Sequence, residues 1–174
     1  MLGIYSKTMI QPIKHCYWVV PGKLLAGEYP RNKNETTSQE KINALLEAGI
    51  SVFVDLTEET EGLLSYTTLI GKAIHRRFAI RDVAIPDSPE TTTQILDTID
   101  CYIEQGEMVY VHCWGGVGRT GVIIGCWLAR KGNGGEAALI GLRELWAQCP
   151  KSVIRKTPDT REQEHYIRSW ETGQ

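Results

Sequence analysis

The sequence predicts an α/β fold in which a central, largely parallel sheet of about four to five strands is flanked by helices. Short apolar runs rich in β-branched residues alternate with longer segments whose apolar residues follow helical spacing. A glycine-rich turn after one of these runs indicates a site beyond the carboxyl ends of the strands. The 174 residues, 42% of them hydrophobic, suffice for one core, so we expect one domain over residues 1–174, with residues 1–16 loosely attached.

Five apolar runs predict the strands. The first two form an edge hairpin over residues 16–20 and 23–26, because the Pro-Gly pair between them is a turn signal. Residues 50–56 and 108–111 are continuous apolar runs, which suit strands buried on both faces of a parallel sheet. Residues 77–80 predict one further short strand.

Helical spacing predicts the remaining elements. Residues 38–48 form a helix with Ser38 as its cap, and residues 64–74 form a second one. A third helix opens at Asp87 or Ser88 and closes at Gly106. The last three are expected over residues 120–131, over residues 136–147, and in a stretch that Thr157 caps and Pro158 begins.

Charge and cysteine content exclude several classes of protein. The net charge of −2 provides no basic field for nucleic acid or an anionic membrane. The five cysteines form an odd set without a C-x-x-C pair, which argues against a disulfide scaffold and a zinc site. No stretch approaches 18 consecutive apolar residues, so we expect a soluble, cytoplasmic protein. We also expect a monomer that uses no metal or organic cofactor.

The segment from Val111 to Gly121 carries the chemistry. Three glycines in the four residues 115–118 let successive backbone N–H groups point inward, which makes a concavity for an oxyanion. The helix that follows adds its positive N-terminal end. Cys113 lies at one lip, where helix N-termini and cations favour a thiolate. Arg119 lies at the other lip and can grip two phosphate oxygens with its planar fork.

This segment resembles a known signature. The pattern His112-Cys113-x-x-Gly116-x-x-Arg119-Thr120 resembles the H-C-x-x-G-x-x-R-[S/T] motif of cysteine-dependent protein tyrosine phosphatases at every defined position. The compact length and the Gly-Gly-x-Gly-Arg loop look most like the dual-specificity branch, including the kinase-associated phosphatase type. Residues 25–30 look like the entry segment of bacterial and related small members, and the resemblance covers residues 17–170.

The resemblance implies a role for each loop residue. Cys113 would be the nucleophile, His112 would orient the loop, and Thr120 would hydrogen-bond the leaving thiolate. The residues expected to bind the phosphate, or a similar oxyanion such as sulfate, are Trp114, Gly115, Gly116, Val117, Gly118 and Arg119. The sequence argues against a nucleotide-binding P-loop, because Cys113 and Arg119 replace its first glycine and its lysine.

Ester cleavage also needs a carboxylic acid, and two candidates follow the strand expected at residues 77–80. Asp82 directly follows that strand and lies 31 residues before Cys113, a spacing similar to that of the family, so we favour it. Asp87 instead looks like part of a helix cap. Near the C-terminus, Gln163 resembles the family glutamine that helps to place the hydrolytic water, although a capped surface helix explains it equally well.

Some assignments stay open at this stage. Asp55 and Glu58 could buttress Arg119 or be solvated turn residues. Cys126, 13 residues after Cys113, suits packing better than a reversible disulfide. The expected substrate is a protein phosphorylated on tyrosine, with serine or threonine also open. The alternatives are a phosphoinositide or another small phosphorylated molecule, and a phosphopeptide-binding module without catalysis.

Overall fold

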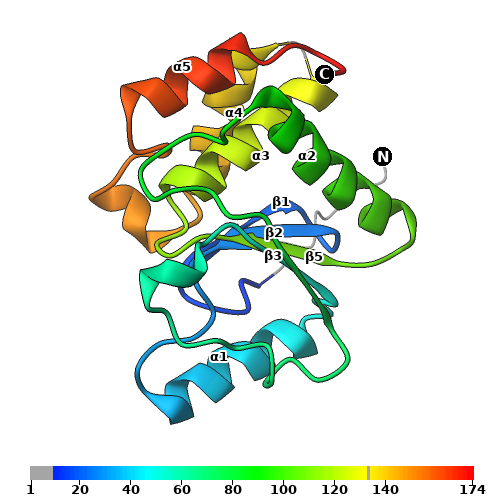
Figure 1. Ribbon diagram of the computed structural model, residues 1–174, viewed down its shortest axis with the longest axis vertical. Coiled ribbons are helices and arrows are strands. Elements are labelled where there is room, and N and C mark those ends of the chain that lie inside the picture. Colours follow the sequence, from blue (N-terminus) through cyan, green and yellow to red (C-terminus); the bar gives the residue numbers. More distant parts are fainter. Residues whose placement is uncertain (1–9, 133) are drawn as a thin grey trace, which may run out of the picture.

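The computed structural model describes residues 10–132 and 134–174, and a five-stranded sheet forms its centre. The strand order is β1-β2-β5-β3-β4, with β1 and β2 antiparallel and the other neighbours parallel, as Figure 1 shows. The strands are β1 (Cys16–Val20), β2 (Leu24–Gly27), β3 (Val52–Asp55), β4 (Ile74–Arg77) and β5 (Val109–His112). The α/β fold class and the largely parallel sheet are therefore confirmed.

Helices cover both faces of this sheet. Helix α1 lies on one face, and α2 to α5 lie on the other (Figure 1). The helices are α1 (Glu35–Glu47), α2 (Pro89–Glu104), α3 (Gly118–Lys131), α4 (Gly135–Trp146) and α5 (Arg161–Ser169), with short 3₁₀ turns η1 (Glu59–Glu61) and η2 (Pro150–Val153). Side chains of the central strands alternate between the two resulting cores, since Val52 and Val54 face the α2–α5 side and Phe53 the α1 side.

The region after β3 differs from the prediction. Residues 64–73 form a loop with turns instead of a helix, and residue 74 already begins β4. The backbone is left-handed at Gly62 (φ 68°), just before this stretch, and at Gly71 (φ 60°), within it. Tyr66 and Ile70 of this stretch are buried in the α1-side core. The fourth strand is Ile74–Arg77 instead of residues 77–80, because it pairs with β3 from Val52 opposite Ile74 onward.

Two helix starts also differ from the prediction, and at a third the structure decides between the two caps that the sequence offered. Asn34, and not Ser38, caps α1 by accepting from the Thr37 N–H at 3.0 Å. The cap of α2 is Ser88, so Asp87 has no capping role. Helix α5 begins at Arg161 with Thr160 as its cap. The Thr157 hydroxyl instead donates a hydrogen bond to the Val117 carbonyl, in the loop between β5 and α3. In each case a nearby hydroxyl or amide competes for the same role.

The N-terminal segment is described from residue 10 onward. The expected loose segment, residues 1–16, falls in part on residues 1–9, which lie outside the described residues. Within residues 10–16, Ile13 is buried, and Gln11 Nε2 donates to the carbonyls of Cys16 and Gln148.

None of the helices in the described residues combines the length and the apolar character needed to cross a membrane.

Candidate active site

The loop that joins β5 to α3 turns its carbonyl oxygens outward. The donors are parts of distant segments: Tyr29 N bonds the Trp114 carbonyl at 2.9 Å, Lys151 Nζ bonds the Gly115 carbonyl at 2.9 Å, and Thr157 Oγ1 bonds the Val117 carbonyl at 2.7 Å. A peptide group is planar, so its N–H points away from its C=O. The following amides therefore face the inside of the loop, as an oxyanion cradle requires.

Close packing against β2 explains one of the glycines. Gly116 has a left-handed φ of 74°, and a Cβ built there would lie 2.4 Å from the Gly27 carbonyl carbon. Only glycine fits this position, because both the backbone conformation and the space exclude a side chain. Gly116 thus lets the loop rest directly on the end of the neighbouring strand.

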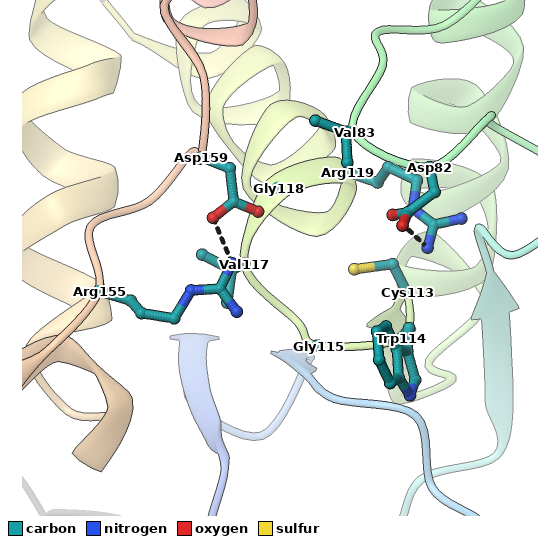
Figure 2. A pocket seen from close by; sticks show the side chains of 10 residues that line it. All are labelled: Asp82, Val83, Cys113, Trp114, Gly115, Val117, Gly118, Arg119, Arg155 and Asp159. Carbon is teal, nitrogen blue, oxygen red and sulfur yellow. Dashed lines mark hydrogen bonds and ion pairs between the residues drawn. The ribbon is translucent and has the colours of Figure 1, made fainter.

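Cys113 lies inside this loop, at the base of a pocket of about 110 Å³. Its side chain is buried, and the Gly116 N–H points at its Sγ from 3.3 Å. Figure 2 shows Sγ directed into the pocket, with Asp82 and Arg119 on one side and Arg155 and Asp159 on the other. Helix α3 begins at Gly118, so its positive end faces the same space.

Arg119 is oriented by a carboxylate that the sequence interpretation missed. Its Nη1 and Nη2 donate to the two carboxylate oxygens of Glu61, at 2.5 and 3.0 Å, and Nη1 also donates to the Ile80 carbonyl at 3.0 Å. The guanidinium has five N–H groups in a fixed plane. These bonds leave the Nε hydrogen and the outer Nη2 hydrogen as the edge that can grip an oxyanion.

Asp55 and Glu58, which the sequence suggested as supports for Arg119, have other hydrogen-bond partners. Asp55 is fully buried and accepts from His75, Arg77 and Thr57. Burial would raise the pKa of Asp55, but the bond from His75, the neighbouring His112 and the bonds from Thr57 lower it below its ordinary value. Glu58 forms a reciprocal capping box with Glu61, which fixes the turn that presents Glu61. That capping pattern was the only sequence signal for Glu61.

Of the two candidate acids, Asp82 lies in the pocket. Its Oδ1 is 3.0 Å from Arg119 Nη2, and its side chain is 54% exposed, so it can meet both the arginine and a bound ester. It follows the end of β4 by five residues, in a loop, and not directly as expected. The next residue, Val83, has a left-handed φ of 63°, which is strained for a β-branched residue. Asp87 does not line this pocket.

His112 belongs to a buried network behind the loop. Its Nδ1 donates to the Cys113 carbonyl at 3.2 Å, and its Nε2 accepts from the Tyr66 hydroxyl at 2.6 Å. Burial lowers the pKa of His112 to about 4, with the carboxylate of Asp55 acting in the opposite direction. The ring is therefore neutral near pH 7 and orients the loop by hydrogen bonding.

Two other predicted residues lie close by. The Thr120 hydroxyl is buried and has no hydrogen-bond partner among the described residues. Gln163 is also buried; its Nε2 donates to the Ala84 carbonyl at 3.0 Å, and its Oε1 accepts from the backbone of Asp159 and Thr160. Gln163 thus links the Asp82 loop to the start of α5, and it is not one of the residues that line the pocket.

The far wall of the pocket holds a pair that was not predicted. Arg155 Nη2 donates to Asp159 Oδ1 at 2.5 Å, and both side chains line the pocket. Cys126, in contrast, is buried in the core on the α2–α5 side, and burial raises the pKa of its thiol. Within the described residues, no three His, Cys, Asp or Glu side chains form a group that could hold a metal ion.

A cysteine, a guanidinium and a ring of inward amides on one loop are the features of the cysteine-dependent phosphatase class. The family model described as "Polymorphic toxin system, DSP-PTPase phosphatase" matches residues 27–133. The chain therefore belongs to this family of dual-specificity-type protein tyrosine phosphatases. The resemblance to the dual-specificity branch that the loop motif suggested is thereby confirmed.

Individual relatives agree with this assignment. The chain is 35% identical over 114 residues to "Putative tyrosine phosphatase 067L" of Invertebrate iridescent virus 3, a match that covers 63% of this chain and 44% of that protein. The chain spans about half the length of the curated relatives it matches.

Solved structures share the fold. The active form of Tk-PTP is 22% identical, with a TM-score of 0.73 over 90% of this chain and 96% of that one. Kinase associated phosphatase is 20% identical, with a TM-score of 0.66 over 83% of each chain.

Proposed function

We propose that the chain is a phosphomonoesterase that acts through a phosphocysteine intermediate on phosphotyrosine in proteins or peptides, with phosphoserine and phosphothreonine as further substrates. One observation carries the proposal: Cys113 Sγ points into a small pocket whose wall also holds Arg119 and Asp82. These three groups supply a nucleophile, a clamp for the phosphoryl oxygens and a proton donor. Family membership supports the same chemistry.

In the first step, the Cys113 thiolate attacks phosphorus while the bond from phosphorus to the ester oxygen breaks. The amides of residues 114–119 and the free edge of Arg119 hold the three equatorial oxygens, where negative charge develops. Asp82, in its protonated form, gives its proton to the departing phenol or alcohol. Asp82 must exchange its contact with Arg119 for one with the leaving oxygen, which its exposure allows.

In the second step, water attacks the phosphocysteine and gives a proton to the Asp82 carboxylate. The bond between sulfur and phosphorus breaks, and inorganic phosphate leaves. The buried hydroxyl of Thr120, which lacks another partner in the described residues, would donate to the departing thiolate. A role for Gln163 in placing the water stays a prediction, since its carboxamide is engaged with both neighbouring loops.

The pocket walls favour an aryl phosphate over a polyphosphorylated ligand. Trp114 and Val83 are large apolar side chains that line the pocket and remain exposed, so they offer contact area to a phenol ring. Loop residues 114–118 carry no charge that could meet additional phosphates. The charge of Arg155 is already paired with Asp159. A phosphoinositide is therefore the weaker candidate.

A kinetic panel tests this function. We expect turnover of p-nitrophenyl phosphate and of a tyrosine phosphopeptide, with lower kcat/KM for matched serine and threonine phosphopeptides and for a phosphoinositide. Cys113→Ser should lose several orders of magnitude in turnover, because a neutral hydroxyl is a far weaker nucleophile, while it retains phosphate binding. Phosphate binding by the parent without any turnover would instead support a phosphopeptide-binding module.

We also propose that the chain works as a monomer in a reducing, cytoplasmic setting. All the groups of the proposed mechanism come from one chain, and the five cysteines, all of which lie in the described residues, are free thiols. Light scattering of the purified chain across a concentration series tests the first point. A dimer that persists on dilution would refute it.

A further inference from the structure

One charged side chain holds a peptide group of the phosphate loop from behind. Lys151, in η2, donates to the Gly115 carbonyl at 2.9 Å across 36 residues of sequence. The Gly115–Gly116 peptide is the one whose N–H points at Cys113 Sγ. Because the two ends of a trans peptide point in opposite directions, fixing this carbonyl also fixes the direction of that N–H.

This peptide group depends on its partner more than its neighbours do. It lies between two glycines, so no side chain restricts its rotation. A Cβ at Gly115 would meet nothing nearer than 3.8 Å, so packing does not fix this residue from the side-chain direction. The Trp114 and Val117 carbonyls belong to residues with side chains and are held by the backbone of Tyr29 and the hydroxyl of Thr157.

The ammonium of Lys151 is itself fixed by a carboxylate. Glu28 Oε2 accepts from Lys151 Nζ at 2.9 Å and from His15 Nδ1 at 2.9 Å, and Glu28 Oε1 accepts from Lys41 Nζ at 2.6 Å. The side chains of Glu28 and Lys151 are only 18% and 20% exposed. Burial acts to raise the pKa of Glu28, but the bonds from Lys41 and Lys151 lower it overall, so the carboxylate remains charged.

The position of Glu28 couples this pair to the base of the loop. Its backbone carbonyl accepts from the Tyr110 hydroxyl at 2.6 Å, and it follows Gly27, on which Gly116 rests. A charge-assisted bond from a lysine fixed in this way is stronger than a bond between neutral groups. We infer that Lys151, held by Glu28, is a positioning residue that aims the Gly116 N–H at the phosphoryl oxygens.

The inference rests on the proposed function, and Lys151→Met tests it. Methionine keeps most of the apolar stem but loses the donor. Removing an oxyanion donor outright costs about 10²–10³-fold in kcat. Because the Gly116 N–H stays present but is less well oriented, we expect kcat/KM for p-nitrophenyl phosphate to fall about tenfold and the inhibition constant of inorganic phosphate to rise severalfold. Lys151→Arg should recover part of both losses.

Lys156→Met provides the matched control. Lys156 lies five residues further along, pairs with Glu164 at 2.8 Å and is 61% exposed. Its loss should leave both constants at parental values. A role of Lys151 in stability alone would lower the melting temperature without changing phosphate inhibition, and would overturn the inference. So would a Lys151→Met chain with parental kcat/KM.

A second variant decides the matter if Lys151→Met fails to fold. Glu28→Gln leaves Lys151 in place but removes the charge that fixes it. We expect kcat/KM for p-nitrophenyl phosphate to fall severalfold and the inhibition constant of inorganic phosphate to rise severalfold. Parental values in a folded Glu28→Gln chain would then refute the inference. The parent chain separates the two proposals. If the parent turns over no phosphate ester, the proposed function is contradicted. Phosphate binding, compared between the parent and Lys151→Met, still tests the role of Lys151.

Discussion

Both terminal nitrogens of Arg119 are bonded to Glu61, so the guanidinium of the phosphate loop has a fixed plane before any substrate binds. The side chain of Glu61 is 14% exposed and that of Arg119 is 1% exposed. Burial of Glu61 would raise its pKa, but the bonds from Arg119 and Glu58 lower it overall, which keeps the pair ionised. The free edge of the guanidinium is therefore directed at the pocket.

Glu61→Gln should lower kcat/KM by about tenfold, since the neutral carboxamide can accept only one of the two bonds and its NH₂ group faces the other donor. Steady-state kinetics with p-nitrophenyl phosphate measures the effect. Glu59→Gln is the control, because Glu59 lies in the same turn but is 86% exposed and pairs with Arg77. Equal activity of the two variants would contradict an orienting role for Glu61.

Asp82→Asn should slow substrates according to their leaving group. General acid catalysis contributes about 10²–10⁴-fold and matters most for a poor leaving group. We therefore expect a large loss of kcat with an alkyl phosphate or phosphopeptide and a much smaller one with an acidic phenol. Asp87→Asn, outside the pocket and without a capping role, should match the parent with every substrate. A leaving-group-dependent loss in Asp87→Asn alone would reverse the assignment.

Gly116→Ala should both destabilise the chain and impair phosphate binding. A left-handed alanine costs about 1–2 kcal/mol, and the contact with Gly27 adds to it, so we expect a loss of more than about 2 kcal/mol in the free energy of unfolding. Urea unfolding and phosphate inhibition measure the two effects. Gly71→Ala has a similar φ but open space around its Cβ, so it should cost only about 1 kcal/mol and leave binding unchanged.

Stability should fall between about pH 6.5 and pH 4 because of His112. The folded pKa is about 4 and the unfolded value is about 6.5, so only the unfolded chain gains this proton in that range. The lost stability amounts to about 3 kcal/mol. His112→Asn should show a shallower decline in urea midpoint between about pH 7 and about pH 4.5. An unchanged slope would mean that His112 is not neutral in the fold.

Local sequence was enough to predict the phosphate loop. Residues 112–120 contain the nucleophile, the glycines and the arginine in one continuous stretch, and the strand before it and the helix after it follow from their apolar patterns. Four of the five strands and most helices were predicted for the same reason. The structure agrees with these predictions because each depends on residues that are close in the chain.

The residues that support the loop could not be predicted in this way. Glu61 and Lys151 contact Arg119 and Gly115 across 58 and 36 residues. The capping pair with Glu58 is the only local signal near Glu61, and it does not indicate a contact with Arg119. The segment over residues 64–74 was mistaken for a helix, whereas in the structure Tyr66 and Ile70 pack in the α1-side core from a loop with a left-handed glycine at Gly71. Tertiary packing decided these cases.

The pocket is lined by three separate stretches of chain, at residues 82–83, 113–119 and 155–159, which meet only at the carboxyl end of the assembled sheet. An oxyanion bound there therefore has affinity for the folded chain and none for the unfolded one. At a concentration about 100 times its dissociation constant, such a ligand adds about 2.7 kcal/mol to the free energy of unfolding. Inorganic phosphate bound there would therefore stabilise the whole chain against unfolding, and local opening of any one stretch would release it.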